Sequence, residues 1–330
     1  MHNARTRRRL LQQGLALGLA ATLRPGNAAE PLDAAWRDAA RQRDLPYRLR
    51  VPPTSTATST FTPWPLLIYS HGLGGGRDGG SFWGEAWAAA GFAVLHLQHP
   101  GSDSNTLRTG MAALRKAASG EQLAARVADV RFALDEVARL AQAGVAPWHA
   151  LRLDQVGLAG HSFGAHTTLA LAGQRYPMSG SLADARPRAF IAFSPASPPA
   201  GGLSLQQAFG DITRPLLAVT GSLDGDPFGS YASGDSRAAV YDGLPPGQRG
   251  LLWLDGADHM SFGGGRPASV GAGTMVRRAA VARERQAVHQ ALVAHVTTLW
   301  WQAQLLGDTA ARAALAQPQG LGPGDRLQLG

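Results

Sequence analysis

Residues 156–173 read VGLAGHSFGAHTTLALAG, and this stretch decides the fold. An apolar segment ends at Gly160, and Ser162 and Gly164 complete a G-x-S-x-G spacing before an apolar helical segment begins. Glycines on both sides of the serine let strand and helix backbones pass closely without a Cβ clash. The pattern predicts a buried strand, a sharp turn at Ser162 and a helix whose N-terminal amides face the serine. On its own it is equally compatible with a glycine-rich connection in which Ser162 only caps the helix.

The N-terminus has the pattern of an export signal. Residues 6–12 read TRRRLLQ, an apolar run follows over 15–23, and a small-x-small site ends at Ala28. The paired arginines resemble the twin-arginine type, although a Sec signal also has a basic start. We therefore expect residues 1–28 to be a cleaved leader and the mature protein to be exported to the periplasm or secreted.

Composition bounds the remainder of the chain. With 330 residues, 45% of them hydrophobic, and no repeats or long linker, we expect residues 29–330 to form a single domain. The leader carries five arginines and no acid, so its removal lowers the formal charge from +8 to +3, and no nucleic-acid partner is indicated. No internal run of about 18 apolar residues predicts a membrane span in the mature chain. Without cysteine, disulfides, a thiol nucleophile and thiolate metal sites are excluded.

Short apolar segments alternate with helical ones along this domain. The alternation predicts an α/β fold with a mostly parallel central sheet covered by helices on both faces. Residues before 47 are expected to begin with a short helix, and the glycine- and proline-containing C-terminal tail is expected to be flexible. The predicted strands besides the one before Ser162 are 47–51, 66–69, 92–97, 189–193, 216–220 and 250–254, and the predicted helices are 82–90, 119–143 and a long C-terminal one.

Candidate partners for Ser162 follow it in the chain. A serine hydroxyl needs a base to take its proton and an acid to orient that base. Asp224 follows one predicted strand, in TGSLDGDP, and His259 follows the next, in DGADHMSF. This is the Ser, acid, His order of α/β hydrolases. Asp226 is the alternative acid, but Pro227 biases its backbone to an extended conformation that leaves the site, so we choose Asp224.

Two backbone amides are candidate donors to an oxyanion. Phe163 follows the serine, and Leu73 lies in SHGLGG after the strand 66–69. Aromatic residues that could line a substrate pocket, each of which could equally belong to the core, are Trp83, Trp87, Phe163 and Phe228.

Other polar residues near these motifs are interpreted as structural. His161 is expected to face away from Ser162, His166 to be a packed or wall residue and His71 to bond to loop backbone. Asp103 and Asp258 have histidines nearby but no metal-ligand spacing, so no metal and no cofactor are predicted.

Four segments, SHGLGG, HPGSD, GHSFGA and GADHMSF, resemble the bacterial dienelactone-hydrolase-like proteins related to platelet-activating-factor acetylhydrolases, which are α/β hydrolases. The resemblance extends from about Tyr47 to at least Phe262. It implies that Ser162 is the nucleophile and His259 the base, and that the two amides named above form the oxyanion hole.

The chain departs from the acetylhydrolases at the acid. In those proteins the acid follows the strand immediately after the elbow helix, where this sequence reads AFSPAS with Ser194. The resemblance therefore implies an acid one strand later, as in the dienelactone hydrolases.

These observations predict an exported serine hydrolase that cleaves small-molecule carboxylic esters through an acyl-enzyme. The resemblance implies that the acyl groups are short. A lactone, polyester or peptide is the alternative substrate for the same mechanism. A binding protein that kept the fold without activity is the alternative outside enzymes. The sequence leaves the oligomeric state open.

Overall fold

The computed structural model describes residues 30–53, 63–177, 180–225, 232–265 and 278–330. The predicted leader, Asp226 and Phe228 therefore lie outside the described residues. Within the described ranges, no helix has both the length and the apolar character needed to cross a membrane.

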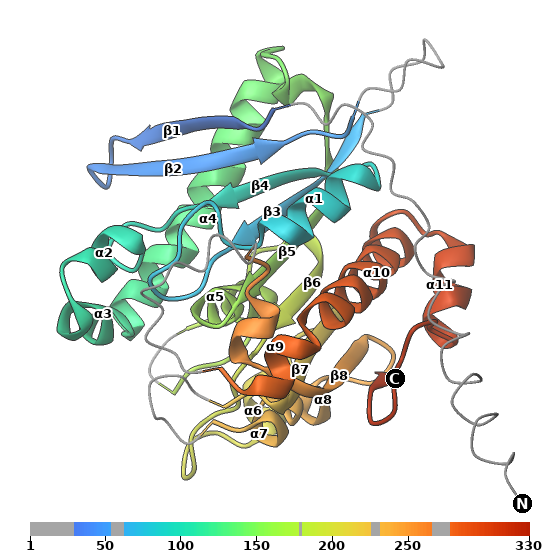
Figure 1. The fold of residues 1–330 in the computed structure, drawn as a ribbon. Helices are drawn as coiled ribbons and strands as arrows, with labels where there is room; N and C mark the ends of the chain where they lie inside the picture. The colour runs from blue at the N-terminus through green and yellow to red at the C-terminus, as the bar shows by residue number, and fades with distance from the viewer. Residues whose placement is uncertain (1–29, 54–62, 178–179, 226–231, 266–277) are drawn as a thin grey trace, which may run out of the picture.

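A nine-stranded sheet in the order β1-β2-β4-β3-β5-β6-β7-β8-β9 forms the centre of the fold (Figure 1). Neighbouring strands from β4 to β8 in this order run parallel, whereas β1, β2 and β9 add to the edges in antiparallel register. The predicted mostly parallel sheet is therefore confirmed. The strands are β1 (Leu32–Asp38), β2 (Arg43–Arg50), β3 (Trp64–Ser70), β4 (Ala93–Leu97), β5 (Leu151–His161), β6 (Pro187–Phe193), β7 (Leu216–Leu223), β8 (Arg249–Asp258) and β9 (Arg326–Leu329).

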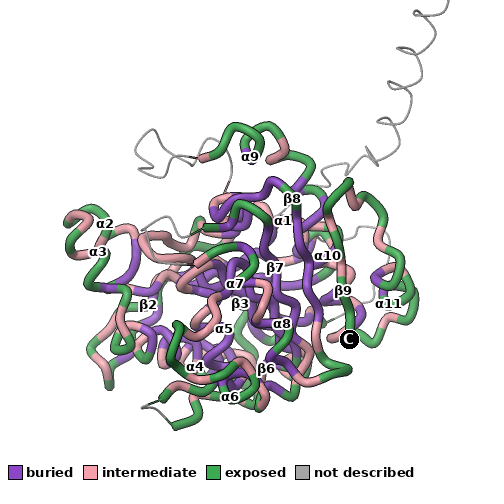
Figure 2. Tube along the Cα trace, turned by 90° about the horizontal axis from the view of Figure 1, so that it is seen from below, coloured by how far each residue is buried: buried purple, intermediate pink, exposed green. Residues whose placement is uncertain are grey.

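Helices cover both faces of the sheet because successive strand residues point to opposite sides. In β3, Leu66 and Ile68 belong to a core shared with α4 and α5, whereas Leu67 and Tyr69 belong to a core shared with α1, α10 and α11. Figure 2 shows inner strands such as β7 and β8 largely buried and the outer surfaces of the helices exposed. The helices are α1 (Ser81–Ala89), α2 (Ser104–Arg108), α3 (Met111–Ala117), α4 (Gly120–Gln142), α5 (Phe163–Ala172), α6 (Leu205–Phe209), α7 (Gly234–Ala238), α8 (Val240–Gly243), α9 (Ala280–Glu284), α10 (Gln286–Leu305) and α11 (Thr309–Ala316), with 3-10 turns η1 (Trp148–Ala150) and η2 (His259–Phe262).

The order of strands reverses at β3, with β4 on one side of it and β5 on the other. In open α/β sheets, ligands bind outside the carboxyl ends of the strands at such a reversal. The segments that follow β3 and β5 are those that contain Leu73 and Ser162. The topology therefore favours a ligand site at the carboxyl ends of β3 and β5.

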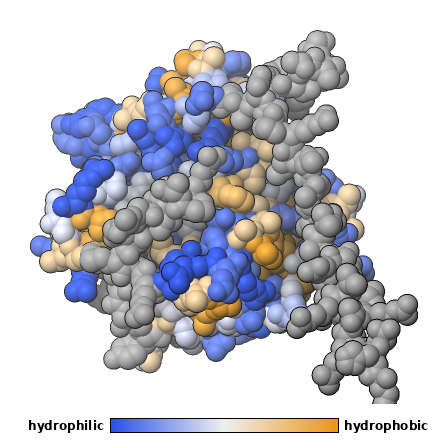
Figure 3. Space-filling model, in the orientation of Figure 1, coloured by the Kyte–Doolittle hydropathy of each residue, from blue (hydrophilic) through white to orange (hydrophobic). Residues whose placement is uncertain are grey.

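The N-terminal helix predicted before residue 47 is wrong, since β1 and β2 form an antiparallel hairpin there. Alanine and arginine favour a helix in this segment, but pairing with β2 and packing of Trp36 outweigh that preference. The Trp36 ring lies 4.1 Å from Tyr47 and 5.2 Å from Trp148, between centroids. Figure 3 shows a mostly hydrophilic surface over this hairpin, where Arg48 pairs with Asp33.

The predicted flexible tail is also wrong at its end. Residues Arg326–Leu329 form β9, which pairs with the outer edge of β8. The guanidinium of Arg326 lies 4.4 Å from the ring centroid of Trp253 on that strand. The edge of β8 offers unpaired backbone groups, and the tail satisfies them.

Candidate active site

Ser162 lies at the turn between β5 and α5, with φ of 56° and ψ of −115°. A non-glycine residue in this region costs about 1–3 kcal/mol and is retained where the surroundings enforce it. A Cβ added at Gly160 would lie 2.2 Å from the carbonyl oxygen of Gly164, and one added at Gly164 would lie 1.9 Å from that of Ser70. Close backbone packing therefore requires both glycines, as the motif predicts.

The first amides of α5 are directed toward this turn. Phe163 is the first residue of the helix, so its amide has no carbonyl partner four residues earlier within it. The amide of Ser162 itself donates to the carbonyl of Phe193 at 2.9 Å. The helix N-terminus thus presents N–H groups and positive dipole beside the serine.

His259 and Asp224 meet at the ends of neighbouring parallel strands. Asp224 directly follows β7, His259 begins the turn after β8, and His259 Nδ1 lies 2.8 Å from Asp224 Oδ1. Both side chains are buried. A carboxylate accepts from Nδ1–H, which leaves Nε2 as the nitrogen able to take a proton. The structure thus brings together the acid and the base that the sequence named.

The Asp224 carboxylate is surrounded by donors. Thr220 Oγ1 donates to Oδ2 at 2.8 Å, and Arg237 Nε lies 3.1 Å from Oδ1. Burial alone would raise the pKa of Asp224. The hydrogen bond from His259 and the charge of Arg237 lower it by more than burial raises it, so the pKa of Asp224 lies below its ordinary value. The carboxylate is therefore held ionised at neutral pH.

Arg237 joins the loops that follow β6 and β7. Its Nη1 donates to the carbonyls of Ser194 at 2.9 Å and Pro195 at 2.8 Å, while its Nε donates to the carbonyl of Asp224 at 2.9 Å. Ser194, at the position where the acetylhydrolases carry the acid, is buried with φ of 51°. Sequence reasoning missed Arg237 because no motif surrounds it; only the fold brings α7 beneath the two loops.

His161 links the serine turn to His259. Its Nε2 lies 2.9 Å from the carbonyl oxygen of His259, and the two ring centroids are 4.8 Å apart. Burial, with the neighbouring His259, lowers the pKa of His161 to about 3, so the ring is neutral. A carbonyl only accepts, so Nε2 carries the proton and donates. The residue before Ser162 is thereby fixed against the backbone of the base.

The loop after β3 lies against the serine from the other side. A Cβ added at Gly72 would lie 3.4 Å from Ser162 Cβ. His71 Nε2 accepts from the amide of His99 at 2.9 Å, so its proton is on Nδ1, which donates to the carbonyl of Gly72 at 2.6 Å. The predicted role of His71 in bonding loop backbone is confirmed.

This hydrogen bond also orients the amide of Leu73. The carbonyl of Gly72 and the N–H of Leu73 belong to one planar peptide group, so fixing the first fixes the direction of the second. The amide of Gly75 donates to the same carbonyl at 3.0 Å. The loop is therefore rigid at the amide that the sequence named as an oxyanion donor.

The aromatic candidates for substrate walls divide between core and site. Trp83 and Trp87 are fully buried and their indole nitrogens donate within the core, so the alternative that they are core residues is correct. Phe163 and His166 are half-buried, with ring centroids 6.2 Å apart. Burial lowers the pKa of His166 to about 4, so it adds no charge. Phe228 is not among the described residues.

The two remaining acids stabilise turns. Asp103 accepts from the amide of Thr106 at the start of α2, and Asp258 caps η2 and pairs with Arg278 at 2.9 Å. Among the described residues, no group of three or more histidine or acidic side chains is gathered in a way that could hold a metal ion.

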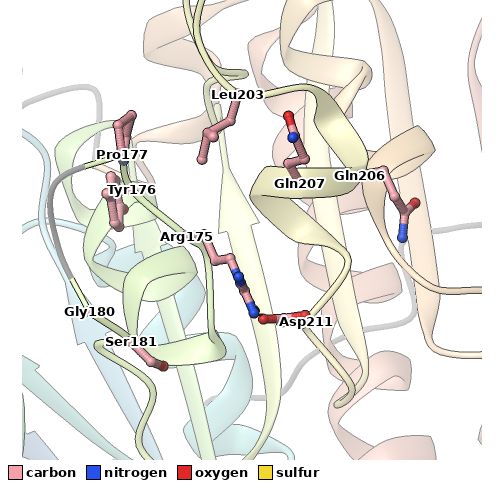
Figure 4. Close-up of a pocket in the computed structure, with 9 residues that line it drawn as sticks. All are labelled: Arg175, Tyr176, Pro177, Gly180, Ser181, Leu203, Gln206, Gln207 and Asp211. Atoms are coloured by element: carbon pink, nitrogen blue, oxygen red, sulfur yellow. Dashed lines mark hydrogen bonds and ion pairs between the residues drawn. The ribbon is translucent and has the colours of Figure 1, made fainter.

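An open pocket of about 730 Å³ lies elsewhere on the molecule (Figure 4). It is beyond the C-terminal end of α5, about 15 Å along the helix from Ser162. Arg175 and Asp211 form an exposed ion pair beside it. The pocket is therefore separate from the serine turn.

Comparisons with known proteins agree with this fold. Residues 48–139 match the family model described as "Platelet-activating factor acetylhydrolase, isoform II", which confirms the resemblance over that part of the chain. The comparison with curated proteins found no match.

Among solved structures, 785 chains match. One of them is the ferulic acid esterase from Streptomyces cinnamoneus, with 19% sequence identity and a TM-score of 0.56. The match covers 84% of this chain and 89% of that one. This likeness, together with the mostly parallel sheet, shows an α/β-hydrolase fold.

Proposed function

We propose that this protein is a serine hydrolase that cleaves carboxylic esters. The observation that carries the proposal is the strained turn at Ser162, whose neighbour His161 contacts the backbone of His259, together with the buried His259–Asp224 pair at the carboxyl ends of the parallel strands. The similarity to the acetylhydrolase family over residues 48–139 supports it. So does the fold, which is shared with a ferulic acid esterase. Backbone strain at Ser162 costs stability, and binding without catalysis requires neither a strained serine nor an oriented imidazole.

The reaction proceeds through an acyl-enzyme. Ser162 Oγ attacks the ester carbonyl carbon while His259 Nε2 takes the hydroxyl proton, and the amides of Leu73 and Phe163 bind the oxyanion. Collapse breaks the carbon–oxygen bond to the alcohol, which leaves with the proton from His259. Water then attacks the acyl group while His259 takes a proton from it. The carboxylic acid product leaves as His259 returns the proton to Ser162 Oγ. Asp224 stabilises the imidazolium in both halves.

Esters with short acyl groups are the proposed substrates. The support is the similarity to an acetylhydrolase family, since an acetyl group is the shortest common acyl group. Initial rates on p-nitrophenyl esters of increasing acyl length test this, with Ser162→Ala as the control for background hydrolysis. We expect the highest kcat/KM on the acetate or butyrate. A maximum on long chains contradicts the short-acyl proposal, and Ser162-dependent turnover of a lactone or polyester in place of these esters redirects the substrate class.

Export is a separate proposal that rests on residues 1–28. Mass spectrometry of the periplasmic and secreted fractions is expected to find a chain that begins close to Ala29. A soluble cytoplasmic protein that keeps Met1 would contradict it.

A further inference from the structure

Arg126 is a buried cation that takes no part in the steps of the proposed reaction. It lies in the second turn of α4, and its side chain is fully buried. Burial lowers the pKa of Arg126 to about 9, against the opposing effect of Asp129, so it stays charged at neutral pH. Burying a cation is costly, and well-packed hydrophobic residues often serve stability as well or better. Stability alone therefore explains this residue poorly.

The guanidinium contacts both segments that carry the proposed oxyanion donors. Nη2 donates to the carbonyl of His71 and to Ser70 Oγ at 3.2 Å, and Nη1 donates to Ser102 Oγ at 3.2 Å. Its central carbon lies 4.7 Å from the ring centroid of Phe163, within the range of a cation–π contact. One side chain thus joins the loop that leads to Leu73 with the first residue of α5. In Figure 1, α4 comes after β4 in the chain and α5 directly after β5, and β3 lies between those two strands in the sheet. Both helices contribute to the same core.

Ser70, which accepts a hydrogen bond from Arg126, is itself part of a series of buried hydrogen-bonded side chains. Ser70 Oγ lies 3.0 Å from His99 Nε2, and His99 Nδ1 lies 3.0 Å from Asp129 Oδ2. Arg41 and Arg43 each approach the same carboxylate at 2.8 Å. Although Ser70, His99 and Asp129 have the residue types of a catalytic triad, all three are fully buried, so substrate does not reach them. They form an anchor rather than a second active site.

We propose that Arg126 is a positioning residue that fixes the two oxyanion donors, the amides of Leu73 and Phe163, relative to each other. The proposal rests on the proposed function. Donors held in advance stabilise a developing oxyanion without reorganisation, so their placement affects the transition state more than bound substrate. Loss of the guanidinium releases the His71 carbonyl and the Phe163 ring from their common contact. The His259–Asp224 hydrogen bond involves neither and remains.

The test compares Arg126→Met and Arg126→Lys with a matched control, Arg249→Met. Arg249 also lies over an aromatic ring, 4.5 Å from the Tyr241 centroid, and donates to two backbone carbonyls, but at the start of β8, away from the site. For Arg126→Met we expect kcat on p-nitrophenyl acetate to fall about 10²-fold with KM changed by less than about threefold. The affinity for a trifluoromethyl ketone, which forms a tetrahedral adduct with the serine, should fall in parallel with kcat/KM. Arg126→Lys, which keeps a charge but not the planar face, should fall in between.

Amide hydrogen exchange over residues 71–76 and 163–166 supplies a readout that does not depend on turnover. Exchange in both segments should rise in Arg126→Met and stay unchanged in Arg249→Met. If Arg126→Met does not fold, the same exchange and kinetic measurements on Arg126→Lys and on Phe163→Leu, which removes the stacked ring but keeps the amide, decide the matter.

The outcomes separate the two proposals. Unchanged exchange, or a kcat close to that of Arg249→Met, overturns the positioning role of Arg126. A change in KM alone overturns it as well. Wild-type protein with no Ser162-dependent ester hydrolysis overturns the proposed function, and the exchange measurement then still decides whether Arg126 joins the two segments.

Discussion

Lowering the pH from 7 to 5 should remove much of the folding stability, because the fold buries neutral histidines. His71, His96, His99 and His161 are all buried. Burial lowers the pKa of His96 and His161 to about 3 and of His99 to about 4, and places that of His71 well below its ordinary value of 6.5. In the unfolded chain these imidazoles take up protons as the pH falls through 6.5, whereas in the folded protein they do not.

The sign and size of the effect follow from proton linkage. Stability falls with decreasing pH wherever the unfolded state binds more protons. Each histidine with a folded-state pKa of about 3 to 4 accounts for about 2 kcal/mol between pH 7 and pH 5, so His96, His99 and His161 together account for about 6 kcal/mol. His71 changes the stability in the same direction. A typical domain has only about 5–15 kcal/mol of unfolding free energy. We therefore expect the protein to be close to unfolding at pH 5 and to lose this contribution fully as the pH approaches the folded-state pKa values.

Urea unfolding followed by tryptophan fluorescence at pH 7, 6 and 5 measures this loss. His96→Asn should reduce the loss by about 2 kcal/mol, since its amide can still donate to the Gly79 carbonyl that His96 Nδ1 contacts at 2.9 Å. His295→Asn is the control, because this histidine is exposed on α10, whereas His96 is buried. An unfolding free energy that is constant between pH 7 and 5, or an equal loss in His96→Asn, would refute the reasoning.

Two further substitutions test the geometry of the site. Asp224→Asn should lower the acylation rate on an activated ester by up to about 10⁴-fold, and Asp226→Asn should have a much smaller effect; the reverse ranking would transfer the role to Asp226. Gly164→Ala should destabilise the fold by about 3 kcal/mol or more in urea unfolding, because its Cβ would lie 1.9 Å from the Ser70 carbonyl oxygen. Gly120→Ala, in α4 with open space around it, should be neutral or slightly stabilising by the same assay, and equal losses in both would contradict the packing argument.

The sheet and the serine turn could be predicted because their signals are local. Apolar segments of strand length alternate with helical ones, and G-x-S-x-G specifies a turn whose glycines are required by contacts within the motif and with the end of β3. Asp224 and His259 could also be predicted from the sequence, for a related reason. Carboxyl ends of parallel strands meet at one edge, so a polar residue after each strand is placed near the others.

The remaining features depend on contacts between distant segments. The helical composition of residues 32–38 conceals a strand because pairing with β2 and packing of Trp36 decide its conformation. The tail forms β9 because β8 has a free edge. Arg237 and Arg126 act on loops that are far away in sequence, and an isolated arginine in a helix carries no pattern that reports its burial. Such residues can be assigned to the site only once the fold is known.

Reaction with a fluorophosphonate tests the central claim most directly. The reagent phosphonylates a serine that an adjacent base activates, so the folded wild-type protein should take up one equivalent, and peptide mass spectrometry should locate it on Ser162. Ser162→Ala should remain unlabelled, and His259→Ala should react far more slowly although its serine is intact. No labelling of the folded wild-type protein, or labelling at another serine, would contradict the account.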